Sequence, residues 1–124
     1  IPYDYDNTLG TCNCYDPARQ DPYNWGDKGL LMERMMEYEE FRAIYREELK
    51  RLVDPANGLM DTQSAMARIL NWQSKIQNYI SNDTGEDMKI EDKPAGWGSW
   101  GNYSLMSSNN NYFTVKAQTI NALR

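Results

Sequence analysis

The chain has 124 residues, of which 40% are hydrophobic, so it is long enough for one compact domain with a core but not for two. Its formal net charge of −5 argues against nucleic acid as a partner, because neutralising phosphates requires a concentrated excess of Lys and Arg. The absence of histidine excludes Ser-His-Asp and Cys-His catalysis and imidazole metal ligands. No stretch approaches the roughly 18 to 20 continuous apolar residues of a membrane-spanning helix, so we expect no membrane segment in this chain.

The chain opens with alternating bulky and acidic side chains. The segment Ile1-Pro2-Tyr3-Asp4-Tyr5-Asp6-Asn7 has a period of two and meets Thr8-Leu9-Gly10, which predicts a short β-strand that runs into a turn. The acids would share one face of this strand. The pattern alone favours an ordinary acidic strand end that caps the turn. Because the chain starts at Ile1, as if a strand had been cut, we expect residues 1–124 to be a single-domain fragment of a longer protein.

Residues 11–28 have the composition of an irregular loop, with Pro17, Pro22 and Gly26 but little periodicity. They include Cys12 and Cys14, which are separated by one residue. A disulfide between these two would close a small, strained ring, and two thiols alone cannot complete a tetrahedral zinc site. We interpret them as ordinary loop thiols, with a zinc site as the alternative.

Apolar residues at intervals of three and four predict an amphipathic helix from Gly29 to Val53, with a break in the Met36-Glu37-Tyr38 region. Asp54-Pro55-Ala56-Asn57-Gly58 predicts a stop and a turn. We expect a second helix to begin after an N-cap at Asp61 and to end at about Ser81. The Tyr and Met stripes on these helices are interpreted as core-packing side chains.

The rest of the chain is predicted to be a long irregular connection followed by a closing helix. In residues 83–111 we expect the acids of 83–87 and 91–92 to be solvated. We expect the tryptophans of Trp97-Gly98-Ser99-Trp100-Gly101 to anchor the loop by burial, with an aromatic surface for a peptide or carbohydrate as the alternative. The closing helix spans Tyr112 to Leu123, with Asn110 or Asn111 as its cap.

The order of these features resembles the CotH kinase family. Ile1 to Gly10 is similar to the family's "P-W-D-x-D-x-x-x-G" segment, although Tyr3 stands where Trp is common. Leu30 to Tyr45 resembles its helix pair, with Glu37 near the place where Pro is frequent, and the later helices resemble its "I-x-x-I-x-x-Y-I" helix and its last helix. The resemblance covers nearly all of this chain, but only the C-terminal part of a family domain.

The resemblance implies a mainly α fold, namely the helical C-terminal lobe of a divergent protein-kinase-like fold, with a short N-terminal β-strand and turn and long irregular loops. It implies that the parent protein transfers phosphate from ATP to protein Ser with Mg²⁺, and that Asp4 and Asp6 hold the metal, with a lesser role for Asn7. The chemistry fits, because Mg²⁺ is usually held by one or two carboxylates together with nucleotide phosphates. Two such residues on one strand lie about 6 to 7 Å apart at the backbone and can converge on a metal ion.

The chain contains no Gly-rich phosphate loop, no ATP-anchoring Lys in a strand context and no separate catalytic-base Asp motif. We therefore predict no catalytic residue in it, no activity of this chain alone and no Mg²⁺ or ATP bound to it. The alternative to an enzyme fragment is a non-catalytic structural or assembly module of a spore coat or cell-surface complex. A free-standing helical interaction domain with an accidental acidic start is the third possibility. The resemblance suggests a spore-coat or cell-surface location and a coat or surface protein as substrate.

Overall fold

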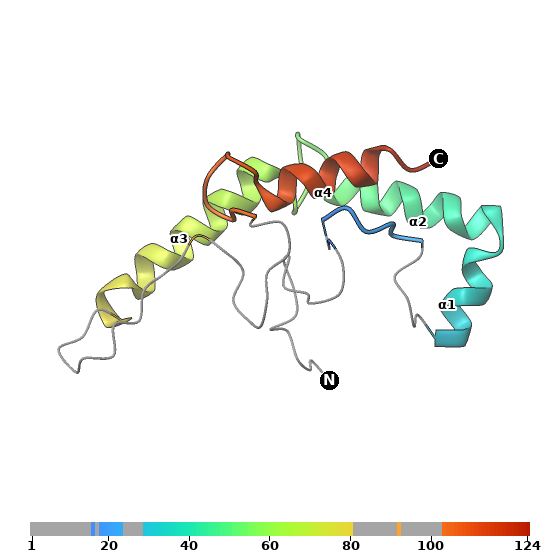
Figure 1. Cartoon of the computed structure of the whole chain (residues 1–124), viewed down its shortest axis with the longest axis horizontal. Helices are drawn as coiled ribbons and strands as arrows, with labels where there is room; N and C mark the ends of the chain where they lie inside the picture. Colours follow the sequence, from blue (N-terminus) through green and yellow to red (C-terminus); the bar gives the residue numbers. More distant parts are fainter. Residues whose placement is uncertain (1–15, 17, 24–28, 81–91, 93–102) are drawn as a thin grey trace.

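The computed structural model of the chain describes residues 16, 18–23, 29–80, 92 and 103–124. Within these residues the fold is mainly α, as the sequence predicts, with four helices and no strand: α1 (Gly29–Met36), α2 (Glu39–Leu52), α3 (Thr62–Ile80) and α4 (Tyr112–Asn121). Figure 1 shows α2 and α3 following one another along the long axis, with α4 lying alongside both. The residues for which an N-terminal β-strand is predicted, the Trp97–Gly101 segment and the acids of 83–87 lie outside the described residues.

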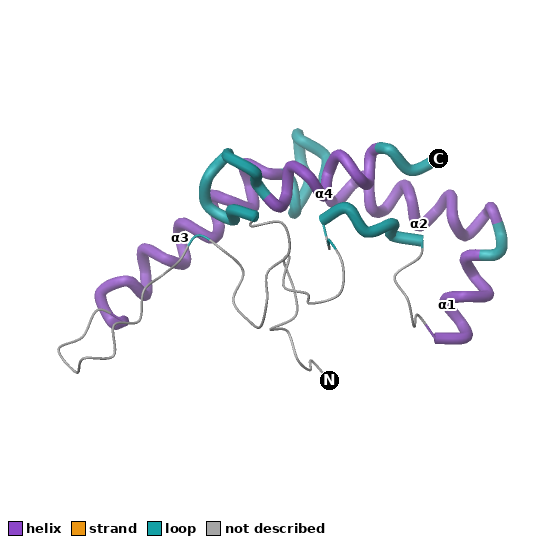
Figure 2. Tube along the Cα trace, in the orientation of Figure 1, coloured by secondary structure: helices purple, strands orange, loops and turns teal. Residues whose placement is uncertain are grey.

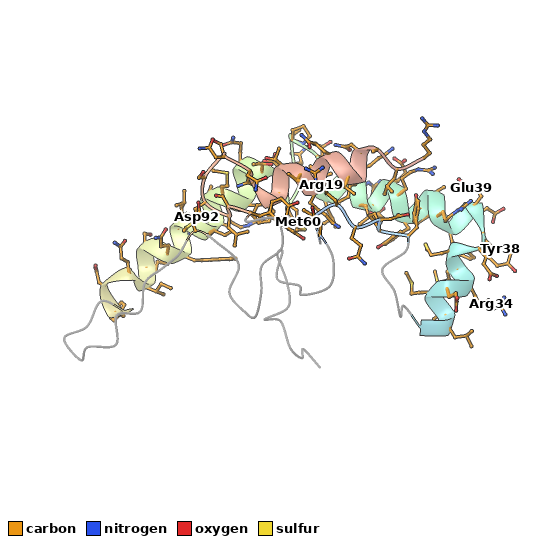
Figure 3. All side chains as sticks on the ribbon, in the orientation of Figure 1. Arg19, Arg34, Tyr38, Glu39, Met60 and Asp92 are labelled. Carbon is orange, nitrogen blue, oxygen red and sulfur yellow. The ribbon has the colours of Figure 1, made fainter. Side chains whose placement is uncertain are left out.

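The predicted break in the first long helix is confirmed, because α1 ends at Met36 and α2 begins at Glu39. The backbone N–H groups of Glu37 and Tyr38 donate to the carbonyls of Arg34 and Met35, three residues back, at 3.2 Å. Such tightened bonds are typical of a helix end. Tyr38 then has extended backbone and precedes α2, and Figure 3 shows Arg34, Tyr38 and Glu39 at this corner.

The turn between α2 and α3 is also as expected. The carboxylate of Asp54 accepts hydrogen bonds from the backbone of Ala56 and Asn57, at 2.7 and 3.2 Å. Asp61 precedes α3 and accepts from the N–H of Ser64 at 3.0 Å, which confirms it as the N-cap. The helix then runs to Ile80, one residue short of the predicted end.

Residues 103–111 form a loop that leads into α4, and Figure 2 shows it beside the helical segments. Asn110 has a φ of 45°, a left-handed conformation that Asn tolerates better than most residues. Asn111 is the N-cap: its side-chain oxygen accepts from Phe113 and Thr114, at 2.9 and 3.4 Å. The helix ends at Asn121, two residues before the predicted end at Leu123.

The main core lies where α4, the first half of α3 and the segment 18–23 meet. Tyr112 sits at its centre, with edge-to-face contacts to Tyr103 and Phe113 at ring-centroid distances of 5.9 and 5.5 Å. Among the residues that the structure describes, the buried members of this cluster are Ala18, Ala65, Tyr103, Tyr112, Phe113 and Val115. Met60, Ile69 and Leu105 pack against it in partly buried positions.

The prediction that the helical stripes pack in a core is wrong for much of α1, α2 and α3. Met36 is buried, but α2 has no buried residue, and Tyr38 and Tyr79 are 60% and 83% exposed. The reason is geometric, since α1 and the C-terminal half of α3 extend beyond α4 (Figure 1). No described element covers the apolar side chains that are exposed there, such as Leu31 and Tyr79.

Candidate functional site

The predicted metal ligands Asp4, Asp6 and Asn7 lie outside the described residues, as do Cys12 and Cys14. Among the residues that the structure describes, no group of three or more Cys, Asp or Glu side chains is arranged to hold a metal ion. The metal site therefore stays a prediction. The structure does describe residues 16 and 18–23, a segment that follows the acidic opening in the sequence.

Asp16 ties this segment to the loop before α4. Both of its carboxylate oxygens lie 2.7 Å from the hydroxyl of Tyr103, which donates to them. The backbone N–H of Ala18 donates to the same carboxylate at 3.1 Å, and the guanidinium of Arg19 forms an ion pair with it at 3.3 Å. Burial raises the pKa of Tyr103, and its hydrogen bond to Asp16 raises it further.

Helix α4 also forms hydrogen bonds with residues 18–20. The hydroxyl of Thr119 donates to the carbonyl of Ala18 at 2.9 Å, and the amine of Lys116 donates to the carbonyl of Gln20 at 3.4 Å. Ala18 is completely buried. These two contacts join residues that are 101 and 96 positions apart in the sequence. Helix α4 and Tyr103 together therefore fix the segment that begins at Asp16.

A small, half-open cavity of about 200 Å³ lies between this segment, α2 and α4. It is lined by Gln20, Asp21, Pro22, Tyr45, Leu49, Lys116 and Ile120. Burial lowers the pKa of Lys116, and the nearby carboxylates of Asp16 and Asp21 partly oppose this effect. Burial also raises the pKa of Tyr45, whose ring lies 6.2 Å from that of Tyr23.

This cavity is smaller than the roughly 300 Å³ at which ligand pockets usually begin. Its walls combine apolar side chains with one cation, Lys116, and one carboxylate, Asp21. A cavity of this size has room for one side chain of a bound molecule. We assign it no ligand. The described part of the chain thus acts as a scaffold that positions the segment after the acidic opening.

Sequence reasoning missed the roles of Asp16, Tyr103 and Lys116. The Asp-Pro dipeptide at 16–17 is a turn signal that could have indicated a structural role for Asp16. The partners themselves are 87 residues apart in the case of Asp16 and Tyr103, and no local pattern links them.

Asp92 combines exposure with a structural role. The sequence predicts a solvated loop acid, and the residue is exposed. Its carboxylate also accepts hydrogen bonds from the hydroxyl of Ser104 and from the N–H groups of Leu105 and Met106, the last two at 2.8 and 2.6 Å. Partial burial would raise its pKa, but these hydrogen bonds outweigh that effect and hold the pKa below its usual value.

In the part of the chain that the structure describes, fold and contacts define a mainly helical protein in which Tyr103 and α4 hold Asp16, Ala18 and Gln20. The family model for CotH kinase protein matches residues 1–119, and the chain therefore belongs to the CotH kinase family. A search of curated proteins and a search of solved structures each found no match. No helix in the described part of the chain is both long and apolar enough to cross a membrane.

Proposed function

We propose that this chain forms the C-terminal part of a CotH-type kinase domain that transfers phosphate from ATP to Ser residues of a protein. The observation that carries the proposal is the family match over residues 1–119, which includes the acidic opening, the helices α1 to α3 and most of α4. A coat or surface protein is the proposed acceptor. In this proposal, the described helices belong to the helical lobe of a divergent kinase-like fold.

In the proposed mechanism, Asp4 and Asp6 hold the Mg²⁺ that neutralises the nucleotide phosphates, and Asn7 supports them. Carboxylates are the ligands that Mg²⁺ uses in phosphoryl-transfer sites, because it requires hard oxygen donors. Such a site is effective only if its ligands are held in place. The anchoring of Asp16 and Ala18 by Tyr103 and α4 would supply that support from just downstream.

The test uses the intact kinase domain that contains this chain, with labelled ATP, Mg²⁺ and a Ser-rich protein acceptor. Changing Asp4→Asn and Asp6→Asn together keeps the side-chain shape but removes the charges that bind the metal. We expect labelling to fall by at least about 100-fold, which corresponds to about 2.7 kcal/mol. Equal labelling by the wild type and the double variant would show that these residues are not the metal ligands.

The matched control is Glu40→Gln, which removes a negative charge from an exposed position of α2. It should label the acceptor at the wild-type rate. Circular dichroism of each variant checks that the helices are intact.

The 124-residue chain alone should neither label the acceptor nor bind Mg²⁺ tightly, because the nucleotide phosphates and the other parts of the site would be missing. Isothermal titration calorimetry measures this directly. A dissociation constant below about 10 μM would contradict the proposed division of the site.

The second candidate is a non-catalytic assembly module of a coat or cell-surface complex. It is favoured by the large apolar side chains exposed on α1 and α3, among them Leu31 at 74% and Tyr79 at 83%. The kinase assay distinguishes the two candidates, since an assembly module would leave the acceptor unlabelled even with Asp4 and Asp6 intact.

A further inference from the structure

One apolar stripe runs along α3, and its first half is packed in the core whereas its second half is exposed. Its members, Ala65, Ile69, Trp72, Ile76 and Tyr79, are spaced alternately four and three residues apart, which is the spacing of a helix–helix seam. Ala65 is buried in the core beside α4, and Ile69 packs against that core. The next three are exposed: Trp72 by 59%, Ile76 by 50% and Tyr79 by 83%.

The exposed half therefore continues an existing helix–helix interface. Figure 1 shows that α3 extends past the end of α4, so the stripe leaves α4 behind without changing its face. In heptad terms, Ile69 and Ile76 are a positions and Trp72 and Tyr79 are d positions. Such a surface suits a second helix laid along it.

The charges beside the stripe indicate which kind of helix fits. Arg68 and Lys75 each precede an a position by one residue, and both are therefore g positions, which govern the choice of partner in coiled coils. Helix α3 contains no Asp or Glu. Neither basic residue forms an ion pair with another residue in the described part of the chain.

A second copy of α3 fits this surface poorly. In an antiparallel pair, the basic g positions of the two copies would face one another and repel. In a parallel pair, they would face the e positions Gln73 and Ile80, which offer no opposite charge.

We propose that the C-terminal half of α3 is a docking surface for an acidic amphipathic helix of a partner protein. The apolar face of the partner covers Trp72, Ile76 and Tyr79, and its Asp or Glu side chains pair with Arg68 and Lys75. This inference is independent of the proposed phosphoryl transfer, because it uses none of the residues assigned to the metal site.

The test titrates the whole chain into a fluorescein-labelled synthetic helix of about 21 residues, with Leu at a and d and Glu at e and g. A matched peptide carries Lys at e and g. Fluorescence anisotropy should show the acidic peptide binding at least about tenfold more tightly than the basic one. Changing Arg68→Glu and Lys75→Glu together should reverse that preference.

The stripe itself is tested with Ile76→Ala, which should weaken binding of the acidic peptide at least about tenfold. Leu70→Ala is the control, since Leu70 is also exposed, by 44%, but lies off the stripe. It should leave binding unchanged. Both positions are exposed, so circular dichroism should show the same helix content in each variant.

Four outcomes would overturn the proposal, and the peptide assay can give three of them. They are no binding of the acidic peptide at about 100 μM, equal binding of the two peptides, and loss of binding in Leu70→Ala as large as in Ile76→Ala. Sedimentation equilibrium tests whether a second copy of the chain occupies this face. If the chain self-associates and Ile76→Asp abolishes the self-association, the face binds a second copy instead.

Discussion

At the scale of single residues, buried or bridging polar side chains hold the loops of this protein. Asp16 fixes the segment 18–23, Asp92 fixes the loop around Leu105, and Asn111 fixes the start of α4. Asn111 is the clearest case, because it is only 1% exposed and uses both ends of its amide. Its nitrogen donates to the carbonyl of Ser107 at 2.7 Å, while its oxygen caps the helix.

We expect Asn111→Ala to lower the free energy of unfolding by about 2 to 3 kcal/mol, because the variant loses the cap and leaves buried backbone groups without partners. Asn111→Ser keeps a capping oxygen but loses the amide donor, so it should lose about half as much. Urea denaturation followed by circular dichroism measures both. A loss no larger than that of Asn121→Ala, at an exposed position of the same helix, would contradict the assigned role.

At the scale of the elements, α2 and α3 are joined by a turn that leaves no room for a side chain at Gly58. The N–H of Gly58 donates to the carbonyl of Asp54 at 2.7 Å, and the N–H of Met60 donates to the carbonyl of Leu52 at the same distance. A Cβ atom at Gly58 would lie 2.6 Å from three backbone atoms of Asp54 and Leu52. Backbone atoms cannot move aside as the end of a flexible side chain can.

Gly58→Ala should therefore cost about 1 to 3 kcal/mol of stability, as overpacking at a well-filled site does. Asn57→Ala, at the neighbouring exposed position, should change stability by less than about 0.5 kcal/mol. Thermal or urea unfolding of the two variants provides the comparison. If they unfold alike, the turn has more freedom than its geometry indicates.

At the scale of the whole molecule, the core is concentrated around α4, whereas α1, α2 and the end of α3 carry apolar side chains that no described element covers. The two phenylalanines of the chain show this contrast. Phe113 is 4% exposed inside the core cluster. Phe41 is 42% exposed and has an edge-to-face contact with Tyr38 at 6.2 Å.

We expect Phe113→Ala to cost about 3 to 5 kcal/mol, which is a large share of the stability of a small domain. Phe41→Ala should cost less than about 1.5 kcal/mol, because the ring is half in solvent and loses mainly its contact with Tyr38. Equal losses in urea denaturation would mean that the face of α2 is covered in solution.

Much of the local structure could be predicted from the sequence, because its causes lie within a few residues of one another. The break at residues 37–38, the turn at 54–58 and the caps Asp61 and Asn111 all depend on bonds between near neighbours. The order of short segments in the sequence also indicates the family resemblance, and the match over residues 1–119 confirms it. The role of Asp4 and Asp6 as metal ligands stays a prediction.

Only the tertiary structure decided which apolar faces are covered and how Asp16 and residues 18–23 are anchored. Helical periodicity shows that Ile69 and Ile76 share a face of α3. Only the position of α4 explains why Ile69 packs against the core whereas Ile76 is 50% exposed. The bond between Asp16 and Tyr103 joins residues 87 positions apart. Burial and long-range pairing depend on where distant segments come to lie, and no local pattern of side chains contains that information.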